Sequence, residues 1–119
     1  MIRYAVYALL LAPIAAFAAD AGHGKQVFEQ CAACHGADGK GSDAAPPLVG
    51  VTGRKAGSIE EFRYSPAMKR SAIVWDQAIL KGFVMNPQGT VKGTRMPFDG
   101  LRDEHDAEDV AAYVATLQP

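Results

Sequence analysis

The sequence predicts an all-α protein with about four to five short helices and long loops. Several segments carry apolar residues at helical spacing, whereas no segment alternates apolar and polar residues as a half-buried strand does. Stretches rich in glycine and proline, such as residues 35–50 and 86–100, separate these segments and predict loops. Loops of this length are uncommon in a compact domain unless something organises them, so the sequence also predicts a large buried group at its centre.

The N-terminal residues have the layout of a secretory signal peptide. Arg3 supplies the early positive charge, an apolar run follows, and the Ala-Phe-Ala stretch that ends at Ala18 fits a cleavage site. The run is shorter than the ~20 continuous apolar residues that a membrane-spanning helix needs. We therefore expect residues 1–18 to be cleaved after Ala18 and residues 19–119 to form a single domain. A retained membrane anchor is the alternative.

The charge balance excludes one class of function. Without residues 1–18 the chain keeps 11 basic and 13 acidic side chains, a net charge of −2, unlike the basic balance of nucleic-acid binders. Acids crowd the run from Asp99 to Asp109, where Arg102 is the single base. A solvated surface explains this run most simply, and a partner-docking patch is the alternative. A domain this small often needs a disulfide, a metal or a cofactor for stability.

The predicted helices begin close to the mature N-terminus. Residues 24–33 form the first, because Phe28 and its apolar neighbours lie at helical spacing. Ser58, followed by two glutamates, suits a short turn at a helix start. Pro66 opens another short helix over residues 66–70.

Two longer helices follow. Apolar residues fall on one face of residues 75–83, and this helix stops before Pro87. Asp103 caps the last helix, residues 103–117, and further acids in its first turn are favoured by the helix dipole. Its apolar stripe consists of Val110, Tyr113, Val114 and Leu117.

The only two cysteines, Cys31 and Cys34, directly precede His35 in the stretch CAACH. A structural zinc site needs four ligands and no second CxxC exists, a redox dithiol would accompany a βαβ pattern, and a disulfide this short would stabilise little. C-x-x-C-H is instead the attachment motif of c-type haem. Two thiols one helical turn apart each form a thioether with a haem vinyl group, and the histidine meets the iron. The sequence therefore predicts one covalently attached haem c per chain.

The second axial ligand has five candidates, which are Met68, Met85, Met96, His23 and His105. Met96 stands in a loop rich in glycine and proline, where its thioether can be aimed at iron, and its polar neighbours argue against core filling. We expect Met68 to line the pocket, Met85 to fill the core and His105 to lie on the surface. His23 is close to the mature N-terminus, so Met96 is favoured.

With these features the sequence resembles the class I cytochromes c, the family of the soluble mitochondrial carrier and its bacterial relatives. The resemblance runs from about residue 22 to residue 117 and rests on several motifs in order, which are CAACHG, PPLVGVTGRKAG, FRYSPAMKRSAIVW, NP, GTRMPF and DVAAYV. It implies the small cytochrome c fold, with helices and loops wrapped around one haem.

The resemblance also implies roles for single residues. His35 and Met96 would be the axial ligands of the iron, and the carbonyl of Pro47 would accept the ring N–H of His35. Residues that bind the inner haem propionate, whose charge is costly to bury unpaired, would be Arg54, Tyr64 and Trp75, and Thr94 would bind the other propionate. The haem would be lined by Leu48, Leu80, Phe98 and Leu101. The crossing of the first and last helices would be formed by Gly24, Phe28, Val110 and Tyr113.

The sequence departs from the mitochondrial members at the haem edge and inside the pocket. Gln30, Gln88 and Gly89 stand where those members present lysines, while Arg95 keeps its charge. Inside the pocket, Phe83 replaces a tyrosine and Met68 replaces an asparagine, and both changes remove a polar group.

The implied function is that of a monohaem periplasmic carrier of single electrons in respiratory or photosynthetic electron transfer. As a monomer, it would exchange electrons with donor and acceptor proteins through the exposed haem edge. The alternatives are a membrane-tethered cytochrome c module and a haem-based gas- or peroxide-handling protein with a labile sixth ligand. No nucleophile–base pair is evident, so we expect neither enzyme activity, nor a small-molecule substrate, nor a nucleic acid.

Overall fold

The computed structural model of the protein describes residues 1–9 and 18–119. In these residues the chain forms six helices, and the only strand-like pairing is an isolated bridge between Lys55 and Val74. The helices are α1 (Ala21–Val27), α2 (Glu29–His35), α3 (Pro66–Arg70), α4 (Gln77–Met85), α5 (Pro87–Thr90) and α6 (Glu104–Ala115). The all-α prediction is confirmed, with one helix more than the expected four to five.

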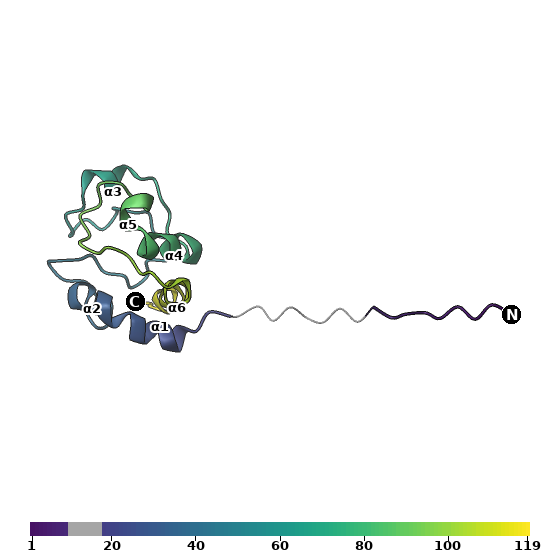
Figure 1. Ribbon diagram of the computed structural model, residues 1–119. Coiled ribbons are helices and arrows are strands. Elements are labelled where there is room, and N and C mark those ends of the chain that lie inside the picture. The colour runs from purple at the N-terminus through teal and green to yellow at the C-terminus, as the bar shows by residue number, and fades with distance from the viewer. Residues whose placement is uncertain (10–17) are drawn as a thin grey trace.

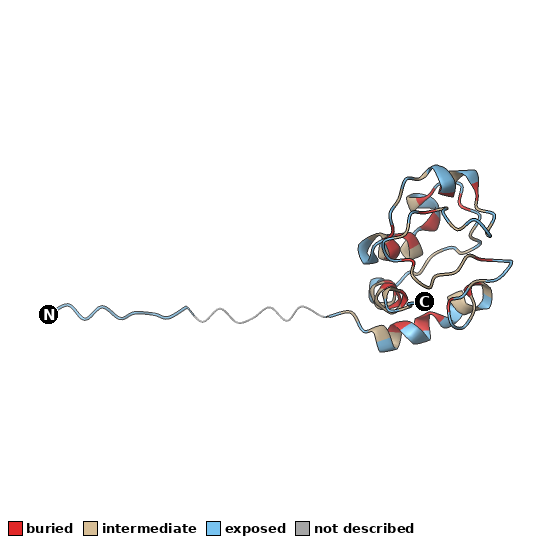
Figure 2. Ribbon diagram, turned by 180° about the vertical axis from the view of Figure 1, so that it is seen from behind, coloured by how far each residue is buried: buried red, intermediate tan, exposed pale blue. Residues whose placement is uncertain are grey.

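The helices form two groups. In Figure 1, α1, α2 and α6 lie on one side of the molecule and α3, α4 and α5 on the other. Helix α6 contacts both α1 and α4 and so joins the two groups. Figure 2 shows the buried residues on the sides of the helices that face the interior. The largest apolar side chains of this core are Phe28, Met68, Trp75, Leu80 and Phe83.

The first predicted helix is longer than expected and divided in two. Asp20 begins α1, because its side chain accepts the N–H of His23 at 3.0 Å. Phe28 ends α1 and starts α2, which continues to His35. Gly36 then stops α2 with a φ of 84°, a conformation that only glycine adopts without strain. Helix α2 therefore carries the whole CAACH stretch.

The prediction of an uninterrupted loop over residues 86–100 is wrong at its start, where α5 forms. Asn86 caps this helix by accepting the N–H of Gly89 at 2.9 Å through its side chain. Pro87 is the first helical residue, a position that needs no N–H donor, and its side chain is fully buried. Proline therefore starts a helix here as well as ending one.

The other helices begin with side-chain caps. Ser65, Asp76 and Asp103 accept N–H groups three residues later, at 3.1, 2.8 and 3.0 Å. Asp103 is thus the cap that the sequence predicted, and α6 ends two residues earlier than expected, at Ala115. Each cap satisfies a backbone donor that the helix cannot satisfy itself.

The predicted crossing of the first and last helices is confirmed. A Cβ on Gly24 would overlap the carbonyl oxygen of Asp109, so only glycine lets α1 approach α6 this closely. The rings of Phe28 and Tyr113 lie beside this point with their centroids 5.2 Å apart. Val110 is fully buried at the same crossing.

In the described parts of the chain, no helix is long and apolar enough to cross a membrane. The predicted signal peptide extends over residues 10–17, which lie outside the described residues, and residues 1–9 are exposed.

Candidate functional site

A cavity of about 400 Å³ lies between the two groups of helices. Its size is that of a cofactor site, and its walls are mostly apolar and aromatic side chains. Residues from α2, α3, α4 and α6 and from the long loops line it. The buried group predicted from the loop lengths therefore has a place in the fold.

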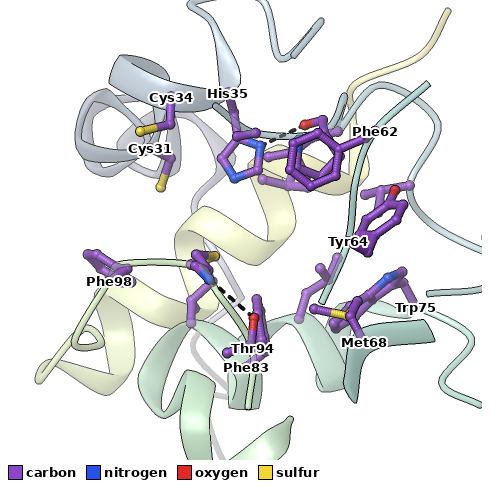
Figure 3. Close-up of a pocket in the computed structure, with 18 of the residues that line it drawn as sticks. Cys31, Cys34, His35, Phe62, Tyr64, Met68, Trp75, Phe83, Thr94 and Phe98 are labelled. Atoms are coloured by element: carbon purple, nitrogen blue, oxygen red, sulfur yellow. Dashed lines mark hydrogen bonds between the residues drawn. The ribbon is translucent and has the colours of Figure 1, made fainter. Parts of the chain in front are cut away.

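Cys31, Cys34 and His35 line the cavity from α2. Figure 3 shows both sulfur atoms and the imidazole along one wall. The two thiols are free, not joined in a disulfide. Burial, followed by the neighbouring Cys34, raises the pKa of Cys31 to about 11, the opposite of what a reactive redox thiol requires.

The zinc interpretation also lacks support. Across residues 1–9 and 18–119, no three side chains of His, Cys, Asp or Glu are grouped so that they could hold a metal ion. Covalent haem attachment is instead supported by the cavity that Cys31, Cys34 and His35 line together.

The His35 ring is buried and its orientation is set by Pro46. The Nδ1 atom lies 2.8 Å from the carbonyl oxygen of Pro46, so Nδ1–H donates and the Nε2 lone pair is free for a metal. Burial lowers the pKa of His35, the Pro46 bond opposes this, and the charge of Arg54 lowers it further. The neutral imidazole is the form that binds iron.

The prediction that Pro47 accepts the His35 bond is wrong. The Pro47 carbonyl instead accepts a hydrogen bond from the Arg54 guanidinium, which also donates to the carbonyl of Val49 at 3.4 Å. Consecutive carbonyls of an extended segment point in different directions, and here that of Pro46 faces His35.

Thr94 lies across the cavity from His35 (Figure 3). It is buried, and its hydroxyl oxygen accepts the backbone N–H of Met96 at 3.4 Å. Met96 and Phe98 line the same cavity. The segment that follows Gly93 therefore forms the wall opposite α2.

Arg54, Tyr64 and Trp75 line a polar corner of the cavity, where the charge of Arg54 acts on Tyr64 and Figure 3 shows Tyr64 near Trp75. Burial raises the pKa of the Tyr64 hydroxyl, while its bond to the Ile59 backbone and the charge of Arg54 lower it. Arg54 is half-buried, its pKa is lowered by burial, and none of the ion pairs of the described residues includes it. A carboxylate entering this corner would meet an uncompensated cation.

The predicted apolar lining is largely confirmed. Leu48, Leu80 and Phe98 line the cavity, whereas Leu101 does not and instead packs against the core. Met68 and Phe83 also line it, as expected.

Sequence reasoning missed Pro46 and Arg63. Both line the cavity, and Arg63 adds a third guanidinium beside those of Arg54 and Arg95. No carboxylate belongs to the cavity wall in the described residues. The sequence offered one signal for Arg63, which is that it directly precedes Tyr64, a residue already expected at the cavity.

The sequence matches the family described as Cytochrome c over residues 21–118. The chain belongs to the cytochrome c family. This cytochrome c is 40% identical to the cytochrome c2 of Blastochloris viridis over 110 residues, 92% of this chain and 85% of that protein. It is 46% identical to the cytochrome c of Tetrahymena pyriformis over 99 residues, 82% of this chain and 89% of that protein. The solved structure of cytochrome cH from Methylobacterium extorquens aligns with a TM-score of 0.75 at 39% identity, covering 82% of this chain and 98% of that one.

The residues of the cavity fit a haem c, which this cytochrome c binds covalently in one copy. Two free thiols and an oriented imidazole stand together on one wall. Apolar side chains provide the bulk of the remaining lining, and the arginines provide partners for two carboxylates.

Proposed function

We propose that this cytochrome c is a soluble periplasmic carrier of single electrons between redox proteins, with His35 and Met96 as the axial ligands of its iron. One observation carries the proposal. His35 faces Thr94 across a single cavity, and Met96, two residues beyond Thr94, lines that cavity too. A nitrogen and a sulfur donor on opposite walls suit a metal held between them.

The protein positions these donors before any partner arrives. The Nδ1–H bond to Pro46 holds the imidazole ring and increases the basicity of Nε2. The thioether of Met96 is a soft, neutral donor that suits ferrous iron. When bound, the haem c supplies an iron that gains and loses one electron.

The rest of the lining excludes water and balances charge. Buried apolar side chains such as Leu80, Phe83 and Val110 line the cavity, so a haem that fills it would leave little room for solvent near the donors. Arg54, Tyr64 and Trp75 would bind the inner carboxylate, and Thr94 the other, since a carboxylate without partners is costly in an apolar site.

Donor and acceptor proteins would dock at what we call the pocket mouth, the exposed residues that line the cavity. These are Gln30, Ala44, Arg63, Arg95 and Pro97. The mouth is small and carries two cations but no acid, which suits the limited, short-lived interfaces of redox encounters. The protein would act there as a monomer.

The single domain would consist of residues 19–119 after cleavage of residues 1–18. The position of α1 supports this boundary, because its cap Asp20 lies two residues beyond the proposed cleavage point. Mass analysis of the native N-terminus tests it, since an intact Met1 would favour the membrane-tethered alternative.

The visible spectrum of the purified protein in both redox states tests the axial ligands. The ferric protein should show the far-red charge-transfer band of a methionine-ligated haem, and Met96→Ala should abolish it. Met85→Ala, which removes a methionine outside the cavity wall, is the matched control and should keep it. A band that survives in Met96→Ala would point to another ligand. Rapid, complete binding of CO to the reduced wild type would favour gas handling.

A further inference from the structure

Helix α5 places the Gln88 side chain across the backbone of the Met96 loop. The Gln88 Nε2 donates to the carbonyl oxygen of Thr94 at 2.8 Å, and its Oε1 accepts the N–H of Gly93 at 3.0 Å. One side-chain amide thus holds two consecutive residues of the segment that leads to Met96. We propose that Gln88 is the positioning residue that keeps Met96 at the cavity, and we call its two bonds the Gln88 clamp.

The short helix α5, which carries Gln88, is held in place by its neighbours. Pro87 is fully buried, and Asn86 caps the helix through its bond to the N–H of Gly89. A Cβ on Gly89 would collide with the Asn86 side chain, so glycine is needed for this cap. Backbone bonds from Thr90 to Asn86 and from Val91 to Pro87, at 3.0 and 2.9 Å, complete the turn. Gln88 is therefore held on a fixed turn.

The loop that receives the clamp has few other ties. Thr94 N–H donates to Val91 at 3.0 Å, within the same turn. Arg95 reaches the carbonyl of Tyr64 at 3.4 Å, and Met96 N–H reaches Thr94 Oγ1 at 3.4 Å. The Gln88 bonds are the shortest of the side-chain hydrogen bonds described for residues 93–96. They are therefore the main side-chain restraints on the loop, alongside the backbone bonds from Thr94 N–H to Val91 at 3.0 Å and from Phe98 N–H to Met96 at 2.9 Å.

Amide chemistry is required for both bonds. A glutamine side chain offers a donor and an acceptor at one end, whereas a lysine offers only donors and a glutamate only acceptors. The Nε2 bond engages the Thr94 carbonyl, while the Thr94 hydroxyl accepts the N–H of Met96. Gln88 therefore orients Thr94 and Met96 together, although it does not line the cavity itself.

The inference rests on the proposed ligation by Met96, so its test measures how easily Met96 leaves the iron. Imidazole binding to the ferric holoprotein requires the loop to open. Two hydrogen bonds of ordinary strength in a half-exposed site predict an increase of about fivefold in apparent imidazole affinity for Gln88→Ala. The urea midpoint of global unfolding should fall only modestly, by what the same two bonds contribute, because unfolding breaks them too. If Gln88 only stabilised the fold, Gln88→Ala would shift that midpoint and leave imidazole affinity unchanged.

Hydrogen exchange of backbone amides measures the Gln88 clamp directly, whichever residue binds the iron. The Gly93 amide should exchange faster in Gln88→Ala, while the Thr94 amide, bonded to Val91, should respond less. Gln88→Glu keeps an acceptor for Gly93 but sets a carboxylate oxygen against the Thr94 carbonyl. It should preserve Gly93 protection and still raise imidazole affinity. Gln26→Ala, on the exposed face of α1, is the control.

The outcomes separate this inference from the proposed function. Wild-type imidazole affinity in both Gln88 variants overturns the positioning role, and unchanged Gly93 exchange in Gln88→Ala overturns the clamp. A wild-type ferric protein without the far-red band overturns Met96 ligation. In that case the exchange rate of the Gly93 amide by itself tests whether the Gln88 clamp exists.

Discussion

His23 Nδ1 lies 2.8 Å from Asp109 Oδ2, and this contact joins the start of α1 to α6. The other oxygen of Asp109 accepts the backbone N–H of Asp20 at 2.8 Å. One carboxylate therefore holds the first turn of α1 in two places. The hydrogen bond to Asp109 raises the pKa of His23, burial opposes it, and the charges of Asp109, Asp106 and Asp20 raise it further.

The His23 contact should make stability depend on pH. Because the folded-state pKa is raised, protonated His23 stabilises the fold fully below its ordinary pKa of ~6.5, and this contribution is lost as the pH rises through the folded-state pKa. We expect His23→Ala to lower the urea midpoint of unfolding more at about pH 5.5 than at about pH 9. Gln26→Ala should show no such difference. An equal loss at both pH values would contradict the prediction.

The helix crossing should not tolerate a single methyl group. Gly24→Ala would press its Cβ against the Asp109 backbone and the Tyr113 Cβ, so overpacking should cost about 1–3 kcal/mol of unfolding free energy. Gly82→Ala is the matched control, since a Cβ on that exposed residue of α4 meets nothing within 4 Å. It should stabilise by up to ~1 kcal/mol through helix propensity. Denaturant titration measures both, and changes of the same sign would refute the packing argument.

Ala72 occupies a backbone conformation that favours glycine. It lies just beyond α3 with a φ of 58°, which costs an alanine roughly 1–2 kcal/mol, while glycine's greater freedom in the unfolded chain costs roughly 0.5–1 kcal/mol. Ala72→Gly should therefore raise the free energy of unfolding by up to ~1.5 kcal/mol. Ala72→Val, with a branched Cβ, should lower it. Thermal unfolding of the two variants distinguishes the cases, and a destabilised glycine variant would exclude backbone strain at this position.

The pocket mouth should favour small anionic electron acceptors. Arg63 and Arg95 lie there, and no acid lines the cavity, whereas the acids of residues 99–109 lie at and around α6. Salt screens such attraction over about 8–10 Å at 0.1–0.15 M. Oxidation of the reduced protein by ferricyanide should therefore slow as salt is added, and Arg63→Gln should weaken this dependence. Arg70→Gln, a charge change away from the cavity, is the control. A rate that rises with salt would exclude a cationic mouth.

Chemistry that depends on residue type could be predicted from the sequence. CAACH identified the anchoring wall because thiols one turn apart before a histidine have few other uses. Met96 was favoured because its polar neighbours along the chain argue against core filling and its loop can aim the thioether at iron. Arg54, Tyr64 and Trp75 line the cavity, and their proposed role in binding a carboxylate follows from residue type, since a buried carboxylate requires such donors.

Features that depend on backbone direction could not be predicted. Residue type does not distinguish the adjacent Pro46 and Pro47, but only the carbonyl of Pro46 faces His35. Pro87 was taken for a helix breaker, although a preceding Asn86 cap makes it a helix start. The Gln88 clamp depends on that short helix, which positions the Gln88 side chain. It could not be predicted while residues 86–100 were treated as loop.

The two walls of the cavity should retain the cofactor unequally. On α2, Cys31, Cys34 and His35 lie close together and would provide two covalent bonds and an iron ligand, whereas the opposite wall would provide only the thioether of Met96 on a loop. Heat or denaturant should thus release the weaker wall first and leave a coloured, fully loaded molecule that no longer carries electrons well. Because the two thioether bonds would keep the haem attached, we expect such a molecule to recover by closing one loop, without a new cofactor. Thermal loss of the Met96 contact should in that sense be reversed by cooling.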